Sequence, residues 1–249
     1  MNPLISVVVC TYNRADILGL CLQSLAEQTV DKSLYEVIVI DNNSTDSTAN
    51  VVEGFLHAHS NYRSARETAQ GIAHARNRGW QIAQGHYVGY IDDDCRATED
   101  WLQIARATIE EFQPVQIGGV ALAYYLYPKP AWFQDRYATF LLEGEQTRLT
   151  TAHEYFPTMN VFFRRTMFEQ IGGFRTDLGM VGKTIAYGED TEIMIRMRAM
   201  LPHEKIYYVP ALRIYHLTRP EKFSWQWNIR RSFADGRYSF RLFGSNYIA

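Results

Sequence analysis

An apolar run that ends in three consecutive aspartates constrains the fold of this chain more than any other feature. Residues 87–91 (Tyr-Val-Gly-Tyr-Ile) have the composition of a strand buried inside a sheet. Asp92, Asp93 and Asp94 follow directly, and adjacent carboxylates repel one another and are costly to desolvate unless a cation balances them. On an extended backbone Asp92 and Asp94 point to one side and Asp93 to the other. This stretch alone fits a divalent cation bound by Asp92 and Asp94, or an acidic turn that caps the next helix.

The first half of the chain alternates strand-like and helix-like segments, with strands predicted at 4–10 and 37–40 and helices at 17–28 and 51–56. This alternation predicts an α/β fold with a mostly parallel sheet, in which ligands bind beyond the carboxyl ends of the strands. The polar segments 11–14 and 41–44 are therefore expected to meet Asp92 to Asp94 at one edge.

Two charged side chains in this half are candidates for contacts with a nucleotide. Asp41 ends the second strand, where a carboxylate accepts hydrogen bonds from a ribose or a base N–H, although it would also serve as a plain strand terminator. Arg76 lies near the start of a helix predicted over 70–84, where a guanidinium is suited to a phosphate. We expect Gly85 to end this helix.

The second half is predicted to contain a helix at 100–112 and strands at 117–123 and 159–163. A short helix is expected to begin at Arg164-Arg165 and to end at Gly172-Gly173-Phe174. Residues 124–157 lack a clear period. A long irregular stretch inside a compact domain is usually functional or mobile.

Two further positions are candidates for chemistry. Glu189 and Asp190 are predicted at a helix N-terminus, where the macrodipole and free N–H groups stabilise a carboxylate, and a simple N-cap is the alternative. Residues 206–215 are expected to form two short strands around Pro210, and His216 follows them. A histidine at a strand end is a candidate metal ligand, although a structural role is commoner.

The segment 223–243 combines aromatic residues with four arginines in an amphipathic pattern. Three roles are open for it: closing the active site, binding a partner, or lying on an anionic membrane surface.

Composition excludes several classes of protein. The 249 residues fit one large domain, and 25 Lys and Arg against 27 Asp and Glu provide no overall basic field for nucleic acid. The three cysteines have no C-x-x-C spacing and are expected to be reduced thiols. No secretion signal and no apolar run of membrane-spanning length is recognised, so we expect a cytoplasmic protein with at most peripheral membrane contact.

Taken together and in order, the motifs resemble those of the family 2 glycosyltransferases, which have the GT-A fold of nucleotide-diphospho-sugar transferases. The matching segments are residues 6–14, 37–46, 75–79, 90–94, 171–174, 188–190 and His216. Asn42 stands where the family usually has a second acid, and Cys95 replaces the acid that often follows the metal motif.

The resemblance implies a single GT-A domain over 1–249, with a Rossmann-like, mostly parallel central sheet, a smaller acceptor-side sheet and a C-terminal helix. Its nucleotide-sugar-binding half would span 1–116, its acceptor-binding half 117–222 and its C-terminal helix 223–249.

The resemblance also implies the roles of individual residues. Asp190, with Glu189 beside it, would be the catalytic base of an inverting displacement. Asp92, Asp94 and His216 would bind Mn²⁺ or Mg²⁺. The residues implied in donor binding are Thr11, Tyr12, Asn13, Arg14, Asp41, Arg76, Asp92 and Asp93.

The implied reaction transfers a sugar from a nucleotide-diphosphate donor, a UDP-sugar above all, to a hydroxyl of a glycan or glycolipid acceptor. Two alternatives stay open: a non-catalytic scaffold that binds nucleotide or glycan, and a sugar-1-phosphate nucleotidylyltransferase. The second usually has a glycine-rich loop after its first strand, where this chain has Thr11 to Arg14.

Overall fold

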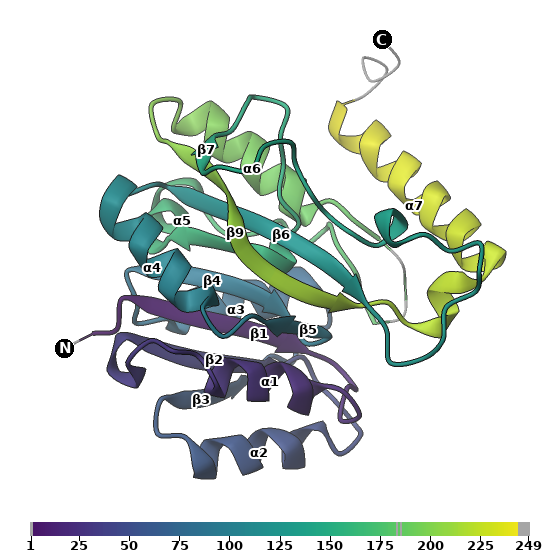
Figure 1. Cartoon of the computed structure of the whole chain (residues 1–249), viewed down its shortest axis with the longest axis horizontal. Helices are drawn as coiled ribbons and strands as arrows, with labels where there is room; N and C mark the ends of the chain where they lie inside the picture. Colours follow the sequence, from purple (N-terminus) through teal and green to yellow (C-terminus); the bar gives the residue numbers. More distant parts are fainter. Residues whose placement is uncertain (1, 183, 185, 244–249) are drawn as a thin grey trace.

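A computed structural model describes residues 2–182, 184 and 186–243. In this part of the chain a nine-stranded mixed sheet, ordered β3-β2-β1-β4-β8-β6-β9-β5 with β7 paired to β9, runs through the molecule between helices (Figure 1). The expected residues 244–249 of the C-terminal helix lie outside the described residues.

The first four strands in space, β3, β2, β1 and β4, are parallel. They span Ile5–Thr11 (β1), Tyr35–Asp41 (β2), Tyr62–Arg66 (β3) and Tyr87–Asp92 (β4), and alternate along the chain with α1 (Leu18–Ala26), α2 (Thr48–Ala58) and α3 (Ile72–Ile82). The sequence did not predict β3, because this edge strand is short and largely polar.

Both faces of β1 are buried, as its continuous apolar sequence predicts. Val7 and Val9 belong to the core on the side of α1, whereas Val8 belongs to the core on the side of α3. Gly79 brings α3 close to the sheet, because a Cβ at this position would overlap the side chain of Val8. This packing holds the first turn of α3 near the carboxyl edge.

The rest of the sheet is mixed: β4 pairs antiparallel with β8, β8 with β6 and β5 with β9, whereas β6 and β9 are parallel. The elements are β5 (Cys95–Ala97), α4 (Trp101–Phe112), β6 (Gln116–Tyr124), β7 (Arg148–Leu149), β8 (Val161–Arg164), α5 (Arg165–Ile171), α6 (Glu189–Met200), β9 (Ile206–Leu217) and α7 (Trp225–Phe243). The strands expected to form a smaller acceptor-side sheet thus continue the main sheet.

Two local predictions are wrong. Helix α3 ends at Ile82, and Gly85 instead allows a close approach, since a Cβ there would lie 2.6 Å from the Ser6 backbone nitrogen. The two short strands around Pro210 are one strand, β9, whose pairing with β6 shifts register between Gly118 and Val120. The irregularity accommodates a proline, which has no N–H to donate to the ladder.

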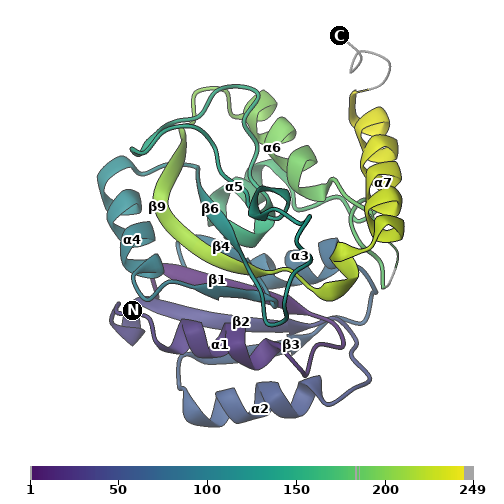
Figure 2. The same cartoon turned by 45° about the vertical axis from the view of Figure 1, so that its right-hand side comes forward.

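Residues 125–157 are largely irregular, as expected, and contain only the short strand β7 and one 3₁₀ turn, Asp135–Tyr137. Helix α7 stands at the rim of the molecule where the long strand β9 ends, in both views of Figures 1 and 2. No helix among the described residues is long and apolar enough to cross a bilayer.

Candidate functional site

The carboxyl ends of β1, β2 and β4 bring polar residues together at one edge of the sheet. In the parallel ladders Thr11 pairs with Asp41, and Cys10 pairs with Asp92. The predicted convergence of these strand ends is confirmed. In open α/β sheets this edge is where ligands bind, so it is the candidate active site.

Asn13 fastens the loop after β1 to the loop after β2. Its φ of 52° is left-handed, its Oδ1 accepts a hydrogen bond from the Thr45 backbone N–H (2.8 Å), and its own N–H donates to Ser44 Oγ (2.9 Å). Asp41 Oδ1 in turn accepts from the Ser44 backbone N–H (2.9 Å). These bonds fix the position of Asp41, and they give Asn13 a structural task beside its expected contact with the base.

Asp93 is buried at the end of β4, on the side of Arg14. Its side chain is 11% exposed, and Arg14 Nε lies 4.0 Å from its Oδ1. Burial, reinforced by the neighbouring Asp94, raises the pKa of Asp93 to about 8. Thr11 is buried nearby, and its hydroxyl has no hydrogen-bond partner within the described part of the chain. Sequence alternation predicted that Asp93 faces away from Asp92 and Asp94, but not that it is buried.

Arg76 links the acidic motif to the start of α6. Its guanidinium is 7% exposed and contacts Glu189 Oε1 (2.5 Å) and Asp92 Oδ1 (3.5 Å). Burial alone would lower the pKa of Arg76, but the charges of Glu189 and Asp92 raise it above its ordinary value. Arg76 therefore has two protein carboxylates as partners, and its expected contact with a phosphate stays a prediction.

Asp190 lies in the first turn of α6, next to this buried pair. Helix α6 begins after Gly188, whose φ of 113° favours glycine, and Asp190 Oδ1 accepts a hydrogen bond from the Thr191 N–H (2.8 Å). Burial and the negative charge of Glu189 raise the pKa of Asp190 to about 7. Asp190 thus has the basicity that proton transfer near neutral pH requires.

Asp94 and His216 form the group that best fits a divalent cation. Asp94 Oδ1 lies 3.6 Å from His216 Nε2, because Cys95 pairs with His216 in the β5–β9 ladder. Burial and nearby Lys222 lower the pKa of His216, which keeps the imidazole neutral and able to coordinate. Together these ligands suit Mn²⁺ or Mg²⁺.

The third member of this group is Cys95 and not Asp92, whose carboxylate faces Arg76. Burial raises the pKa of the Cys95 thiol well above its usual value, so this sulfur stays protonated and is a poor ligand for a hard cation. The sequence suggested Asp92 as a direct metal ligand, but the structure does not group it with Asp94 and His216.

Two cations beside Asp94 were not anticipated. Arg219 Nε lies 3.8 Å from Asp94 Oδ2, and Lys222 Nζ lies 3.3 Å from His216 Nε2. Both follow a strand end, β9, just as the predicted site residues follow β1, β2 and β4. Their position after a strand end was therefore the feature of the sequence that could have identified Arg219 and Lys222 as site residues.

Several motif residues that lie close to the site form hydrogen bonds with backbone groups. Asn42 is buried and holds the loop before α3, donating to the carbonyls of Glu67 (3.1 Å) and Ala69 (2.7 Å). Asn77 exchanges two hydrogen bonds with the backbone of Phe174, both at 2.8 Å. These contacts explain the polar residue at 42 and the 75–79 and 171–174 motifs without a ligand.

Helix α7 contacts the start of α6. Tyr238 is buried, and its hydroxyl donates to the Gly188 carbonyl at 3.1 Å. A Cβ at residue 188 would overlap the Tyr238 ring, so a glycine is required there for α7 to pack. Amphipathic spacing predicted the helix but not this contact with the residue before Glu189 and Asp190.

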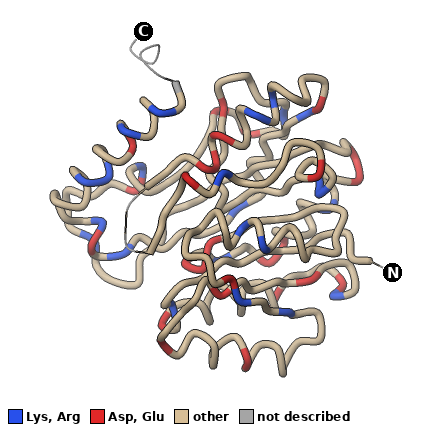
Figure 3. The backbone as a smooth tube through the Cα atoms, turned by 180° about the vertical axis from the view of Figure 1, so that it is seen from behind, with Lys and Arg blue, Asp and Glu red and all other residues tan. Residues whose placement is uncertain are grey.

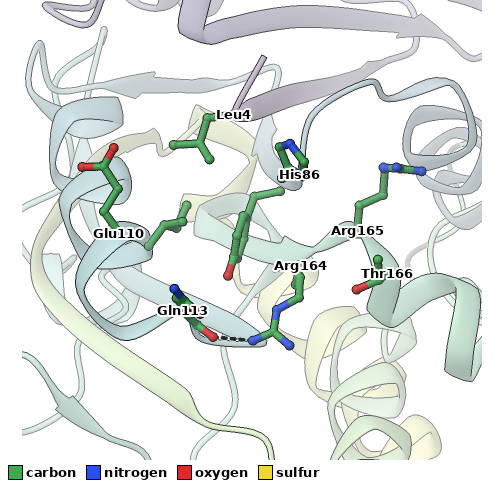
Figure 4. A pocket seen from close by; sticks show the side chains of 9 residues that line it. Leu4, His86, Glu110, Gln113, Arg164, Arg165 and Thr166 are labelled. Atoms are coloured by element: carbon green, nitrogen blue, oxygen red, sulfur yellow. Dashed lines mark hydrogen bonds between the residues drawn. The ribbon is translucent and has the colours of Figure 1, made fainter. Parts of the chain in front are cut away.

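A cavity of about 500 Å³ lies at the opposite end of β4 from the aspartates. Leu4, His86, Glu110 and Arg164 are among its lining residues, and Arg164 contacts the Gln113 carbonyl there (Figure 4). It lies at the amino end of β4, where the fold offers no convergence of strand ends, and it is not part of the candidate site.

Comparison with known proteins identifies the chain's relatives. The model of the family described as Glycosyl transferase family 2 matches residues 6–172. The glycosyltransferase AglE of Haloferax volcanii is 30% identical over 71% of this chain and 57% of its own length. A glucosyl-dolichyl phosphate glucuronosyltransferase of the same organism is 28% identical over 96% of this chain and 76% of its own length. The chain thus spans little more than half of the first relative.

Solved structures show the same fold. Residues 1–349 of S. aureus TarS in complex with UDP-GlcNAc match 98% of this chain and 73% of that chain, with a TM-score of 0.69 and 21% identity. The mannosyltransferase PcManGT of Pyrobaculum calidifontis, in complex with GDP-Man and Mn²⁺, matches 97% of this chain and 64% of that chain, with a TM-score of 0.71 and 21% identity.

Proposed function

This chain belongs to glycosyl transferase family 2, and we propose that it transfers a sugar from a nucleoside-diphosphate donor to an acceptor hydroxyl with inversion at the anomeric carbon. The observation that carries the proposal is the position of Asp190. It sits at the start of α6 with a pKa raised to about 7, and Arg76 connects its neighbour Glu189 to Asp92 of the acidic motif.

The proposed reaction is a single displacement. The acceptor oxygen forms a bond to the anomeric carbon while Asp190 takes the hydroxyl proton. The bond from that carbon to the donor oxygen breaks, and its electron pair leaves with the nucleoside diphosphate. Attack from the face opposite to the leaving group inverts the anomeric centre, as in inverting glycoside hydrolysis with the acceptor in place of water.

We assign the nucleoside to the polar residues at the carboxyl ends of β1 and β2. Asp41 is held by Ser44 at the edge, and the Thr11 hydroxyl is buried without a hydrogen-bond partner in the described chain. Asp93 lies beside Arg14 of the loop after β1, and we assign it to the ribose together with Asp92. Tyr12 and Arg14 lie in the same loop and complete the donor site.

We assign Asp94 and His216 as the direct ligands of Mn²⁺ or Mg²⁺. Asp92, whose carboxylate faces Arg76, is assigned to the same metal centre as a more distant carboxylate. A bound divalent cation supplies charge stabilisation for the departing diphosphate. Arg76 keeps the neighbouring carboxylates of Glu189 and Asp92 in fixed positions, which leaves Asp190 as the carboxylate available to the acceptor.

A thermal-shift screen of nucleotide sugars tests the proposed function. We expect a UDP-sugar to raise the melting temperature, as a ligand that binds only the native state must, and we expect Mn²⁺ to enhance the effect. GDP-sugars form the second panel, because PcManGT is described with GDP-Man. Failure of every nucleotide sugar to bind, with and without Mn²⁺, would contradict the proposal.

We propose a lipid-linked or surface glycan as acceptor and peripheral contact of α7 with the cytoplasmic face of a membrane. Exposed apolar side chains recur on α7 at residues 225, 229, 233 and 240, and Trp225 and Phe233 are 71% and 73% exposed. Four arginines are distributed along the same helix (Figure 3). Aromatic anchors with flanking cations suit an anionic bilayer surface.

Flotation with phosphatidylserine liposomes tests this contact. Phe233→Glu should release the protein from the vesicles, whereas Leu149→Glu, a matched change at an exposed residue of β7, should not. Equal flotation of both variants, or no flotation of the unmodified protein, would remove the membrane from the account.

A further inference from the structure

The turn after β9 carries two cations that the reaction described so far does not use. Arg219 and Lys222 lie beside Asp94 and His216, at the carboxyl edge of the sheet. Asp94 is the carboxylate of this cluster, and it balances one of these two positive charges. One positive charge is therefore left without a counter-charge within this cluster.

Arg219 also lacks hydrogen-bond acceptors. Its side chain is only 16% exposed, and its Nε and Nη2 atoms are buried without an acceptor among the residues that the structure describes. A guanidinium with buried N–H groups is costly to leave unpaired, because it loses its water without gaining a partner. Its separation from Asp94, 3.8 Å, is too long for a hydrogen bond.

The backbone around both residues is fixed. The Leu217 N–H donates to the Asp94 carbonyl (2.9 Å), and the Thr218 N–H donates to the Tyr124 carbonyl (2.9 Å). Asn228 of α7 donates to the Lys222 carbonyl at 3.1 Å. The turn that carries the two cations is therefore fixed against β5, β6 and α7.

We propose that Arg219 and Lys222 form an anion site for the terminal phosphate of the donor diphosphate, the group that leaves with the electron pair of the broken anomeric bond. This inference rests on the proposed function and adds to it a second source of positive charge for the diphosphate, beside the divalent cation. A planar guanidinium matches two phosphate oxygens, and the ammonium of Lys222 adds a point charge beside it. Placing a diphosphate there supplies the acceptors that Arg219 lacks and the negative charge that the cluster lacks.

Calorimetric titration with nucleotides of different phosphate number tests the site. UDP, UMP, GDP and GMP are titrated in EDTA and again in MnCl₂, into the unmodified protein, Arg219→Ala, Lys222→Ala and Arg219→Lys. We expect Arg219→Ala to weaken diphosphate binding about 10- to 100-fold, the range for losing a hydrogen bond to a charged group, and monophosphate binding less than about threefold. Arg219→Lys should be intermediate, because it keeps the charge and loses the fork.

Arg106→Ala is the matched control, since it removes an arginine whose ion pair with Glu110 is on the surface of α4. It should leave every affinity unchanged. If Arg219→Ala does not fold, Lys222→Ala carries the test alone.

Titration with pyrophosphate and orthophosphate in EDTA separates this inference from the proposed function. Pyrophosphate binding that depends on Arg219 would support the anion site even if no nucleotide bound. If Arg219 serves only to neutralise Asp94, both alanine variants keep the unmodified protein's ratio of diphosphate to monophosphate affinity, and the inference is overturned.

Discussion

Replacing Glu189 with glutamine should lower the pKa of Asp190 and move the acid limb of the activity profile to lower pH. Burial and the charge of Glu189 raise the pKa of Asp190 to about 7, and Arg76 opposes them. The substitution removes the negative charge that raises this pKa, and it leaves Arg76, which lowers it, in place, so ionised Asp190 is favoured. Because neighbouring charges shift carboxyl pKa values by about 1 to 3 units, we expect the limb to move down by at least about one pH unit.

The size of the effect on rate follows from the fraction of Asp190 that is ionised. With a pKa of about 7, only about one tenth of the base is ionised at pH 6 and about nine tenths at pH 8. In Glu189→Gln about half or more is ionised at pH 6, but a weaker base lowers the plateau by about threefold or more. The variant should therefore be clearly slower at pH 8 and nearly equal to the unmodified enzyme at pH 6.

The assay is release of nucleoside diphosphate from the donor identified by the screen, with kcat/KM measured from pH 5.5 to pH 9 by about half-unit steps. Glu192→Gln is the matched control, because Glu192 lies one turn further along α6 and pairs with Arg196 at 2.7 Å. It removes the same charge from the same helix and should keep the acid limb near 7. An acid limb that does not move in Glu189→Gln, or that moves upward, refutes the reasoning.

The same ionisation should affect folding. The pKa of Asp190 is raised from 3.8 in a free carboxyl to about 7 in the folded protein, so the native state binds the proton more tightly than the unfolded state does. Its contribution to the free energy of unfolding is present below about pH 4 and is lost as the pH rises through about 7. Urea unfolding at several pH values should show this loss reduced in Glu189→Gln.

Two further substitutions test how the site is supported. Gly119→Ala should lower the free energy of unfolding by about 1–3 kcal/mol in urea titrations, because a Cβ there would overlap the Leu212 carbonyl. Gly54→Ala, in an open position on α2, is the control and should be neutral or stabilising. Equal effects of the two substitutions would contradict the packing argument. Asn160→Ala should lower the free energy of unfolding by about 2–4 kcal/mol. The buried Asn160 side chain accepts a hydrogen bond from Trp101 Nε1 (2.8 Å) and donates to the carbonyls of Val120 and Leu212 (both 2.9 Å). A loss below about 1 kcal/mol would show that water replaces these bonds.

Much of the parallel half was predictable because its signals are local. Continuous apolar strands followed by helical spacing determine β1, α1 and β2, and the position of a residue at a strand end predicts its place at the carboxyl edge. Thr11, Asp41 and Asp92 were placed correctly by this rule alone. The start of α6 was equally clear, because Gly188 precedes two acids and a helical pattern.

What the sequence did not predict depends on contacts between distant segments. The partners of Arg76 are Asp92 and Glu189, and the second is 113 residues away, so no local pattern distinguishes this buried pair from a phosphate ligand. The burial of Asp93 depends on how the loop after β1 folds over β4, and the packing of Tyr238 depends on where α7 returns. The spacing of residues along the chain carries no information on which distant segments come into contact.

The most direct test of the central claim compares donor binding and sugar transfer in Asp190→Asn. The asparagine keeps the size of the side chain and cannot accept the proton, so donor affinity should stay within about threefold while the transfer rate falls by about 100-fold or more. Asp177→Asn, at an exposed aspartate paired with Arg175, should change neither quantity. Turnover close to that of the unmodified enzyme in Asp190→Asn, with the donor bound, would show that another group accepts the proton.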